Sequence, residues 1–440
     1  MGHGPAWVAP QRCTPLRMSD IAQSGQTTVR ITGLRRGFVD FDFILGDPQL
    51  SVELLMPAAE FQDFCQREGA AVTAASPTID ALQASGAFLP EFLGASAPKS
   101  RRGTPMSLEI QTNTLQQRRQ TFAHIARRFG EDRPATRYEE ATLDLQPQRG
   151  FHYRPTWDPA HTLYDKSRTV ITMADWYQLT DPRQFYYGTY TISRARMIET
   201  VDRNFESVAR RGLFDAIDPD WQDLVRFYLI PLRHVEWGAN MNACNITDVG
   251  CGTTITQPAI FAAMDRLGMA QIISRLGLGL GGAETLALGK DIWMTAPEWQ
   301  PMRRLVEDSL VIEDWFEQLV MQFFTLDGLL FPLVYEAFDG RGIAHGASGL
   351  SLICEFMVDW QRESSRWIDA VLTRAARESS ENAALIGRWH THWQARGIEA
   401  LAPLASKVLG DEGEGVLAAL AGSLAGRAAK IGMPGEGAVA

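Results

Sequence analysis

The feature that most constrains this fold is a helical spacing of large apolar residues, which begins after Met106 and continues through much of the chain. Apolar side chains recur three or four positions apart in the stretches 313–324 and 355–371. Such residues share one face of an α-helix. We therefore predict long helices with buried faces over residues 106–430. The members of the two sets are Trp315, Phe316, Leu319, Val320, Phe323 and Phe324, and Phe356, Trp360, Trp367 and Val371.

A different pattern precedes Met106. The segments TVRIT, FVDFDFIL and LSVELLM, within residues 28–57, are β-rich and are separated by turn-forming residues, which predicts two or three strands. Pro57 then opens a predicted helix that ends near Gly69, because Phe61, Phe64 and Cys65 fall on one of its faces. We interpret residues 18–83 as a small α+β domain.

The segment between the two patterns has the composition of a linker. Residues 84–105 are rich in Gly, Ala, Ser and Pro and close with a basic run. Two sequences resemble chain starts, at Met18 and at Met106, and each opens a distinct region. We interpret the chain as two fused ancestral proteins, with residues 1–17 as a non-native or disordered extension and residues 431–440 as a disordered tail.

Composition excludes several classes of protein. The net charge of -10 and the short, scattered basic clusters argue against nucleic-acid binding, which requires Lys and Arg to neutralise phosphates. No stretch approaches ~18 consecutive apolar residues, so we expect no membrane span. The five cysteines are far apart and form no CxxC motif, which favours reduced thiols and a cytoplasmic protein. They are Cys13, Cys65, Cys244, Cys251 and Cys354.

An irregular stretch at 131–190 combines Pro, Arg and aromatic residues with little periodicity. One interpretation is that it docks on a partner, since interface cores are rich in aromatic residues and Arg. The other is that its aromatic side chains cover the helices of this same chain. These side chains are Trp157, Trp176, Phe185, Tyr186 and Tyr187.

A di-iron carboxylate centre on long helices requires two ExxH tetrads, whose Glu and His share a helix face. None of the eight histidines has a Glu three positions earlier. The nearest tetrads are 231–234 (PLRH), with Pro231 where Glu is needed before His234, and 363–366 (ESSR), where Arg366 replaces His. The cation of Arg366 would repel a metal and could neutralise the buried space. These tetrads are either remnants of a metal site or ordinary polar positions. The eight histidines are His3, His124, His152, His161, His234, His345, His390 and His392.

Other candidate sites have simpler explanations. The glycine-rich stretch 277–282 follows a helical segment and not a strand, so it predicts a helix terminus and a turn instead of a dinucleotide loop. Cys244 and Cys251 lack the second pair that a zinc site needs. Asp158 and His161 lie in the irregular stretch. We therefore assign no catalytic, cofactor-binding or metal-binding residue to this chain.

Seven short sequence segments, taken in their order along the chain, resemble those of one protein family. They are HIARRFG (124–130), FHYRPTWDP (151–159), DPRQFYYGTYTISRAR (181–196), PLRHVEWGANMN (231–242), AMDRLGMAQ (263–271), RRLVEDSLVIEDWFE (303–317) and SSRWIDAV (364–371). Together they resemble the beta subunit of the oxygenase component of bacterial phenol hydroxylases, which are multicomponent monooxygenases. The segment 37–66 resembles the small auxiliary or assembly component of the same systems.

The resemblance implies a mainly α, ferritin-like domain without metal ligands, and a structural role in a dimeric alpha-beta-gamma hydroxylase. A di-iron centre in the alpha subunit would convert phenol-type substrates to catechols. An NADH reductase with FAD and a 2Fe-2S cluster, and an effector protein, would complete the system. No cofactor is expected in this chain.

Two other hypotheses come from different classes. The chain could be a self-sufficient helical metalloenzyme with unconventional ligands, or a non-catalytic binding module for an unrelated partner. The ligands of the first would be His234, Glu236, Glu355, Asp359 and Glu363.

Overall fold

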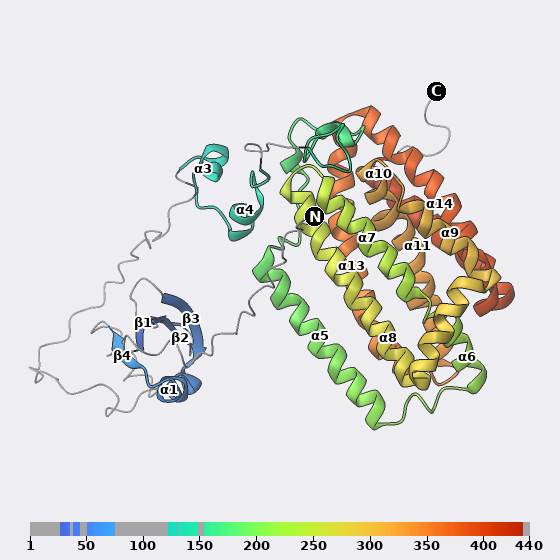
Figure 1. Ribbon diagram of the computed structural model, residues 1–440, viewed down its shortest axis with the longest axis horizontal. Coiled ribbons are helices and arrows are strands. Elements are labelled where there is room, and N and C mark those ends of the chain that lie inside the picture. Colours follow the sequence, from blue (N-terminus) through green and yellow to red (C-terminus); the bar gives the residue numbers. More distant parts are fainter. Residues whose placement is uncertain are drawn as a thin grey trace, which may run out of the picture. The chain divides into compact units, whose positions relative to one another are not determined.

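The chain forms two compact units, residues 1–114 and 115–440, each of which is described by itself. The computed structural model describes residues 27–35, 38–44, 51–74, 122–131, 133–147 and 154–433. Figure 1 shows the elements of both units. The expected extension, the linker, Met106 and most of the predicted tail lie outside the described residues.

The first unit is a mixed sheet with one helix. Its strands follow the spatial order β3-β2-β1-β4, in which β2 pairs antiparallel with β1 and β3, and β4 pairs parallel with β1. Two or three strands and a helix were predicted, and three strands and the helix are present, whereas the short β4 was not predicted. The elements are β1 (Thr28–Arg35), β2 (Phe38–Ile44), β3 (Ser51–Pro57), α1 (Ala58–Arg67) and β4 (Ala71–Ala74).

The core of this unit lies between the sheet and α1. Val39 and Phe41 alternate along β2 and point to the same face, as expected for a strand. Phe61 and Cys65, four positions apart on α1, meet them, and the rings of Phe41 and Phe61 lie 4.7 Å apart. Two different periodicities in the sequence thus build one core.

The second unit is helical, and the predicted fold class is confirmed. Its longer helices are α5 (Tyr187–Arg210), α6 (Pro219–Tyr228), α7 (Leu232–Val249), α8 (Thr253–Thr295), α9 (Gln300–Ser309), α13 (Ser348–Glu378), α14 (Ser380–Leu409) and α15 (Gly413–Ile431). Shorter helices are α3 (Ala123–Phe129), α4 (Arg137–Thr142), α10 (Trp315–Leu319), α11 (Asp327–Pro332) and α12 (Asp339–Ile343). Two π-helical segments are η6 (Val320–Leu326) and η7 (Leu333–Phe338).

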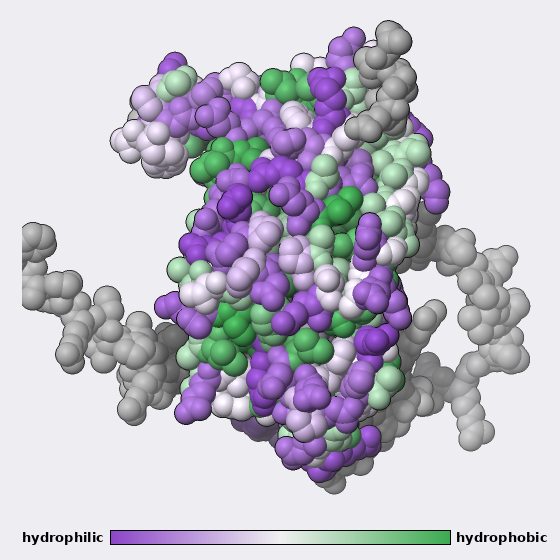
Figure 2. Space-filling view, turned by 90° about the vertical axis from the view of Figure 1, so that its right-hand side faces the viewer, coloured by the Kyte–Doolittle hydropathy of each residue, from purple (hydrophilic) through white to green (hydrophobic). Residues whose placement is uncertain are grey.

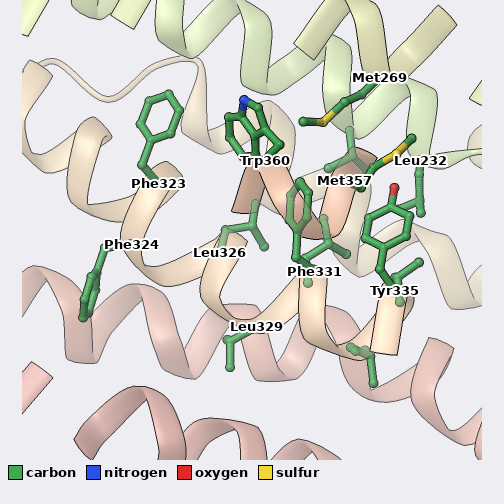
Figure 3. Packing of buried hydrophobic residues seen from close by; sticks show 14 of the residues in the cluster. Leu232, Met269, Phe323, Phe324, Leu326, Leu329, Phe331, Tyr335, Met357 and Trp360 are labelled. Carbon is green, nitrogen blue, oxygen red and sulfur yellow. The ribbon is translucent and has the colours of Figure 1, made fainter. Parts of the chain in front are cut away.

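The elements from α10 to α12 form one continuous helical stretch, Trp315–Ile343, through the core. Among the described residues it is the one helix long and apolar enough to cross a membrane, but 89% of its apolar window is buried inside the protein. The predicted buried faces of this stretch and of α13 are confirmed, since Phe323 and Trp360 are at most 1% exposed. Figure 3 shows how their side chains converge in the core.

The glycine-rich stretch 277–282 interrupts α8 as predicted. Gly281 and Gly282 have non-helical backbone angles, and the chain resumes as helix up to Thr295. Gly282 adopts a φ of 70°, a conformation that only glycine adopts readily. The prediction of a helix terminus and turn is confirmed, and the turn lets the second half of α8 leave in a new direction.

Close packing of α7 against α9 yields a test of this arrangement. A Cβ added at Gly238 would overlap Cγ1 of Val306, whereas a Cβ at Gly268 on α8 would meet no atom within 4 Å. We expect Gly238→Ala to lower the free energy of unfolding by about 1–3 kcal/mol through overpacking. Gly268→Ala should instead raise it by about 0.5–1 kcal/mol. Urea denaturation followed by circular dichroism measures both, and equal effects would contradict the packing.

Candidate functional site

The most unusual group in the helical unit is an ion cluster within the core. Arg266 on α8, Glu236 on α7 and Asp327 on α11 are each at most 1% exposed. Nη1 of Arg266 donates to Oε2 of Glu236 at 2.9 Å, and Nη2 donates to Oδ2 of Asp327. One cation therefore joins α7 and α8, which follow one another in the chain, to α11, which comes only after α9 and α10.

Aromatic rings surround the guanidinium. Its central carbon lies 4.3 Å from the ring centre of Trp360 and 5.3 Å from that of Phe331. The two rings stack on one another at 5.5 Å, as Figure 3 shows. Ring faces attract a cation, and the attraction strengthens where water is excluded. The rings therefore offset part of the desolvation of Arg266.

A second ion cluster is adjacent to the first. Asp265, which precedes Arg266, accepts hydrogen bonds from Nε of Arg194 at 2.9 Å and from the hydroxyl of Tyr190 at 2.9 Å. Nε1 of Trp360 donates to the same carboxylate at 2.7 Å. Trp360 therefore joins the two clusters, since its ring covers Arg266 while its N–H binds Asp265.

The π-helical segment η6 gives Asp327 another partner. Nε2 of Gln322 donates to Oδ1 of Asp327 at 3.0 Å, and both side chains are buried. Residues five positions apart point about 140° away from each other on an α-helix. The wider π-helical turn, which relates residue i to i+5, reduces that angle. The π segment therefore makes this hydrogen bond possible.

The hydrogen bonds continue from Gln322 across α7. Oε1 of Gln322 accepts from Nδ2 of Asn242 at 3.0 Å, and Oδ1 of Asn242 accepts from Nε2 of Gln318 at 2.9 Å. These amide side chains are at most 2% exposed. Buried polar groups are tolerated when they have partners. This row of hydrogen-bonded amides therefore fixes α7 against the helical stretch Trp315–Ile343.

Burial and pairing set the charges of the first cluster. Burial raises the pKa of Glu236 and that of Asp327, and Arg266 opposes this rise. Burial alone would lower the pKa of Arg266, but Asp327 and Glu236 outweigh it, so that pKa is raised. The guanidinium therefore stays charged.

The cluster does not fit a di-iron centre. Such a centre needs carboxylates and histidines that converge on empty space, but Glu236 and Asp327 converge on the Arg266 guanidinium. Throughout the described ranges, no three His, Cys, Asp or Glu side chains gather into a metal-holding group. A permanent organic cation lies between the two carboxylates.

The residues proposed as unconventional metal ligands do not meet. Glu355 and Asp359 are exposed on α13, and Glu363 accepts from Nη1 of Arg194 at 2.8 Å. His234 stacks on Trp293 with ring centres 5.5 Å apart. That ligand set is therefore wrong, and Glu236 alone among its members belongs to the core cluster.

The interpretation of the 363–366 tetrad also needs correction. Arg366 is exposed on α13 and does not neutralise a buried space. The role that was predicted for Arg366, the neutralisation of buried acidic groups, belongs to Arg266. The sequence did contain a signal, because Asp265 and Arg266 interrupt the otherwise apolar helical segment 259–270. Adjacent opposite charges on a buried helix indicate an internal ion pair.

One histidine is also buried away from the cluster. His390 on α14 is 4% exposed, and its Nδ1 lies 3.1 Å from Oγ1 of Thr325. Burial, with a smaller contribution from Arg427, lowers the pKa of His390 to about 4. The imidazole is therefore neutral near pH 7.

The aromatic residues of the irregular stretch divide between the two interpretations. Trp176 is 5% exposed and its ring lies 5.6 Å from that of Trp315, so it belongs to this chain's own core. Tyr186 and Phe185 are partly buried. Trp157 is 74% exposed and Tyr187 is 71% exposed, so the docking interpretation stays a prediction for these two side chains.

Comparison with known proteins agrees with this fold. The family model described as Methane/Phenol/Alkene Hydroxylase matches residues 157–379. The chain is 46% identical over 307 residues to the phenol 2-monooxygenase oxygenase component DmpL of Pseudomonas sp. (strain CF600). It is 42% identical to the corresponding component MhpL of Acinetobacter pittii (strain PHEA-2). Each match covers 69% of this chain and 92% of the relative.

A solved structure is similar as well. It is the crystal structure of xenon-pressurised phenol hydroxylase from Pseudomonas sp. OX1, with 43% identity and a TM-score of 0.70 over 75% of this chain and all of that chain. The chain therefore belongs to the methane/phenol/alkene hydroxylase family, among its phenol hydroxylase oxygenase-component subunits. The model described as Phenol hydroxylase subunit matches residues 24–72, which confirms that a second phenol hydroxylase domain precedes the helical one.

The Arg266 cluster can be tested by removing the cation. Arg266→Met leaves two buried carboxyl groups without their counter-charge, and we expect it to lower the free energy of unfolding by about 3–5 kcal/mol. Adding Glu236→Gln and Asp327→Asn should recover most of this loss, because no uncompensated charge then remains. Urea denaturation measures the three free energies.

Arg303→Met is the matched control. Arg303 pairs at 2.7 Å with Glu307 one turn away on α9, where both side chains are partly exposed. Its loss should change the free energy of unfolding by less than about 1 kcal/mol. If Arg266→Met were equally mild, the cluster would not hold the core together.

The pKa of His390 predicts a pH dependence of stability. The folded pKa of about 4 lies below the ordinary value of about 6.5, so the unfolded chain takes up the proton first as the pH falls. His390 therefore stabilises the fold fully above about pH 6.5, and this contribution is lost toward pH 4. As the pH falls toward 4, the free energy of unfolding should decrease in both proteins. We expect this decrease to be smaller in His390→Asn than in wild type by on the order of 3 kcal/mol, as measured by urea denaturation. His392→Asn, at an exposed position of the same helix, should keep the wild-type profile.

Proposed function

We propose that this chain is the structural beta subunit of an NADH-dependent multicomponent phenol hydroxylase. In this proposal a separate alpha subunit carries a di-iron centre that inserts one oxygen atom of O2 into phenol-type substrates and yields catechols. The phenol 2-monooxygenase oxygenase components among the relatives support the substrate class. The observation that carries the structural role is Arg266, which lies between Glu236 and Asp327 where a metal centre would need free carboxylates.

In this proposal the residues of this chain hold helices in place and take no part in the oxidation. Arg266 ties α7, α8 and α11 together with a cation that cannot dissociate as a metal ion can. Trp360 extends this connection to α5 through Asp265 and Arg194. A rigid subunit of this kind holds the helices of a neighbouring catalytic subunit in a fixed geometry, which sites with several ligands require.

We further propose the partners that the family resemblance implies. They are the alpha and gamma subunits in a dimeric alpha-beta-gamma assembly, an effector protein, and an NADH reductase with FAD and a 2Fe-2S cluster. The N-terminal unit would assist assembly, and the match of residues 24–72 to a phenol hydroxylase subunit supports this role. We propose a cytoplasmic location for the complex.

We propose that the outer face of α7 and α8 contacts the catalytic subunit. Trp237 on α7 is 53% exposed and Leu267 on α8 is 50% exposed. Asn240 on α7 donates to the carbonyl of Ala263 on α8 at 2.8 Å, which fixes the two helices side by side. Met241 and Met264, each 42% exposed, add to the apolar groups on these two helices, and contiguous exposed apolar groups are typical of interaction sites. Figure 2 shows that hydrophobic patches also interrupt a mostly hydrophilic face of the molecule.

A co-expression experiment tests the structural role. We expect the full chain purified alone to bind no stoichiometric iron and to turn over no phenol. Co-expression with an alpha subunit should give an iron-containing complex that is active when the reductase and effector are added. About two irons per chain, with turnover in the absence of an alpha subunit, would overturn the proposal. Deletion of residues 1–105 should lower the yield of the iron-loaded complex if the N-terminal unit assists assembly.

Two pairs of substitutions test the docking surfaces. Trp237→Ser with Leu267→Ser should weaken alpha-beta association at least tenfold, measured by size-exclusion chromatography with light scattering, while helicity stays unchanged. Trp157→Ala with Tyr186→Ala should weaken association more than helicity if the irregular stretch docks on the partner. Val311→Ser, at an exposed position 76% open to solvent, is the control. Equal loss of helicity and association would assign these side chains to the chain's own core.

A further inference from the structure

The sheet of the first unit has one long edge that is open to another strand. β3 lies at one end of the strand order β3-β2-β1-β4, and Figure 1 shows β3 and β4 on opposite sides of the sheet. One long side of β3 therefore has no strand partner among the described residues. A strand at such an edge presents backbone N–H and C=O groups that a further strand can bind. We call Ser51–Pro57 the β3 edge.

The β3 edge lacks the features that usually prevent pairing. Proteins protect an edge by a short strand, a β-bulge, or lysine and proline residues. The opposite edge, β4, is protected because it has only four residues. β3 has seven residues, and its register with β2 has no shift, whereas β1 has one between Ile31 and Gly33. Its sequence, SVELLMP, contains no lysine, and its one proline is the last residue. The β3 edge is therefore suited to pairing.

Apolar side chains on both faces of β3 are open to solvent. Val52 is 55% exposed and Leu55 is 61% exposed, and the two point to opposite faces of the sheet. Val52 lies on the face that α1 covers, because it is opposite Phe43 of β2, whose ring lies 5.3 Å from that of Phe64 on α1. A strand added beside β3 would cover both exposed side chains.

We propose that the β3 edge pairs antiparallel with the β3 edge of a second copy of this chain. The pairing joins two four-stranded sheets into one sheet of eight strands. A two-fold axis perpendicular to the sheet relates the copies and keeps both α1 helices on the same face. The register that aligns all seven residues places Leu54 opposite Leu54 of the second copy, Val52 opposite Met56, and Glu53 opposite Leu55.

The strand is complementary to itself in this register. The apolar pair of Val52 and Met56 forms twice, and such cross-strand pairs contribute about 0.2–1 kcal/mol each. A register centred on Glu53 would place the two Glu53 residues directly opposite one another, and like charges in that position destabilise a sheet. A shift by one residue would move the apolar side chains to the wrong face. These constraints favour the pairing centred on Leu54.

The pairing is expected to be weak in the isolated chain, because a seven-residue edge buries little area. In the proposed dimeric assembly two copies of the chain are held together, which raises the effective concentration of one β3 edge beside the other. Only this strengthening rests on the proposed function. Association of the full chain alone tests the pairing without turnover, so failure of the pairing and failure of the hydroxylase role give different results.

The first test places a lysine at the edge. Val52→Lys puts a cation opposite the apolar Met56 at two symmetric positions. We expect it to raise the dissociation constant of the full-chain dimer, measured by sedimentation equilibrium, about tenfold or more. Leu55→Lys is the matched control on the same strand, because its lysine is opposite the acidic Glu53 and the dimer should be retained. Thr73→Lys, at an exposed position of β4, should also leave the dimer unchanged.

The second test traps the register with a disulfide. Val52→Cys with Met56→Cys places two cysteines opposite one another on either side of the axis. Mild oxidation should therefore link two chains into a dimer on a non-reducing gel. Either substitution alone should give no more dimer than wild type, because each new thiol then lies opposite an unchanged residue. Circular dichroism shows whether each variant has folded.

Three results would overturn the proposal. They are a full chain that stays monomeric in sedimentation equilibrium, a Val52→Lys dimer as stable as the wild-type dimer, and a double-cysteine variant that gives no more dimer than the single variants. A monomeric chain whose association with the alpha subunit is weakened by Val52→Lys would also overturn it and would assign the β3 edge to that subunit. Phenol hydroxylation by the assembled complex alongside any of these results would leave the proposed function standing.

Discussion

The helical unit depends on one buried ion pair network, in which the Arg266 guanidinium is shared by Glu236 and Asp327. A charge inside a protein is tolerated only when it is paired and hydrogen-bonded, because removal from water is costly. Each carboxyl therefore has to stay where the cation can reach it. Since the three residues belong to α7, α8 and α11, this requirement fixes the spacing and rotation of three helices at once.

This network is better understood as a source of specificity than of stability. Apolar residues of similar volume can stabilise a core as well as a buried ion pair does, so the pair by itself is weak evidence for stability. Here Trp360 covers Arg266 and also donates to Asp265, so the two clusters have to form together. The π-helical segment before Asp327 serves the same end, because it aligns Gln322 with that carboxylate.

In the proposed function, the interior and the surface of the chain have different roles. Inside, an organic cation lies between two carboxylates, so the helices keep their geometry without an exchangeable ion. Outside, Trp237, Leu267 and Trp157 present apolar area that no part of the described helical unit covers. A fixed core beneath an exposed apolar surface fits the proposed role of a subunit that positions a catalytic neighbour.

The sequence by itself determined the α+β unit, the long buried-face helices and the break at Gly281 and Gly282, because periodicity and glycine act within a few residues. The strand β4 escaped prediction because four residues carry too little pattern. Family membership also followed from the sequence, because several short segments match the family in the same order along the chain. Only the tertiary structure decided that Arg266, and not Arg366, neutralises the core and that the five suspected ligands lie apart. The physical reason is that helical spacing fixes which residues share a face, whereas packing between distant helices decides which charges meet.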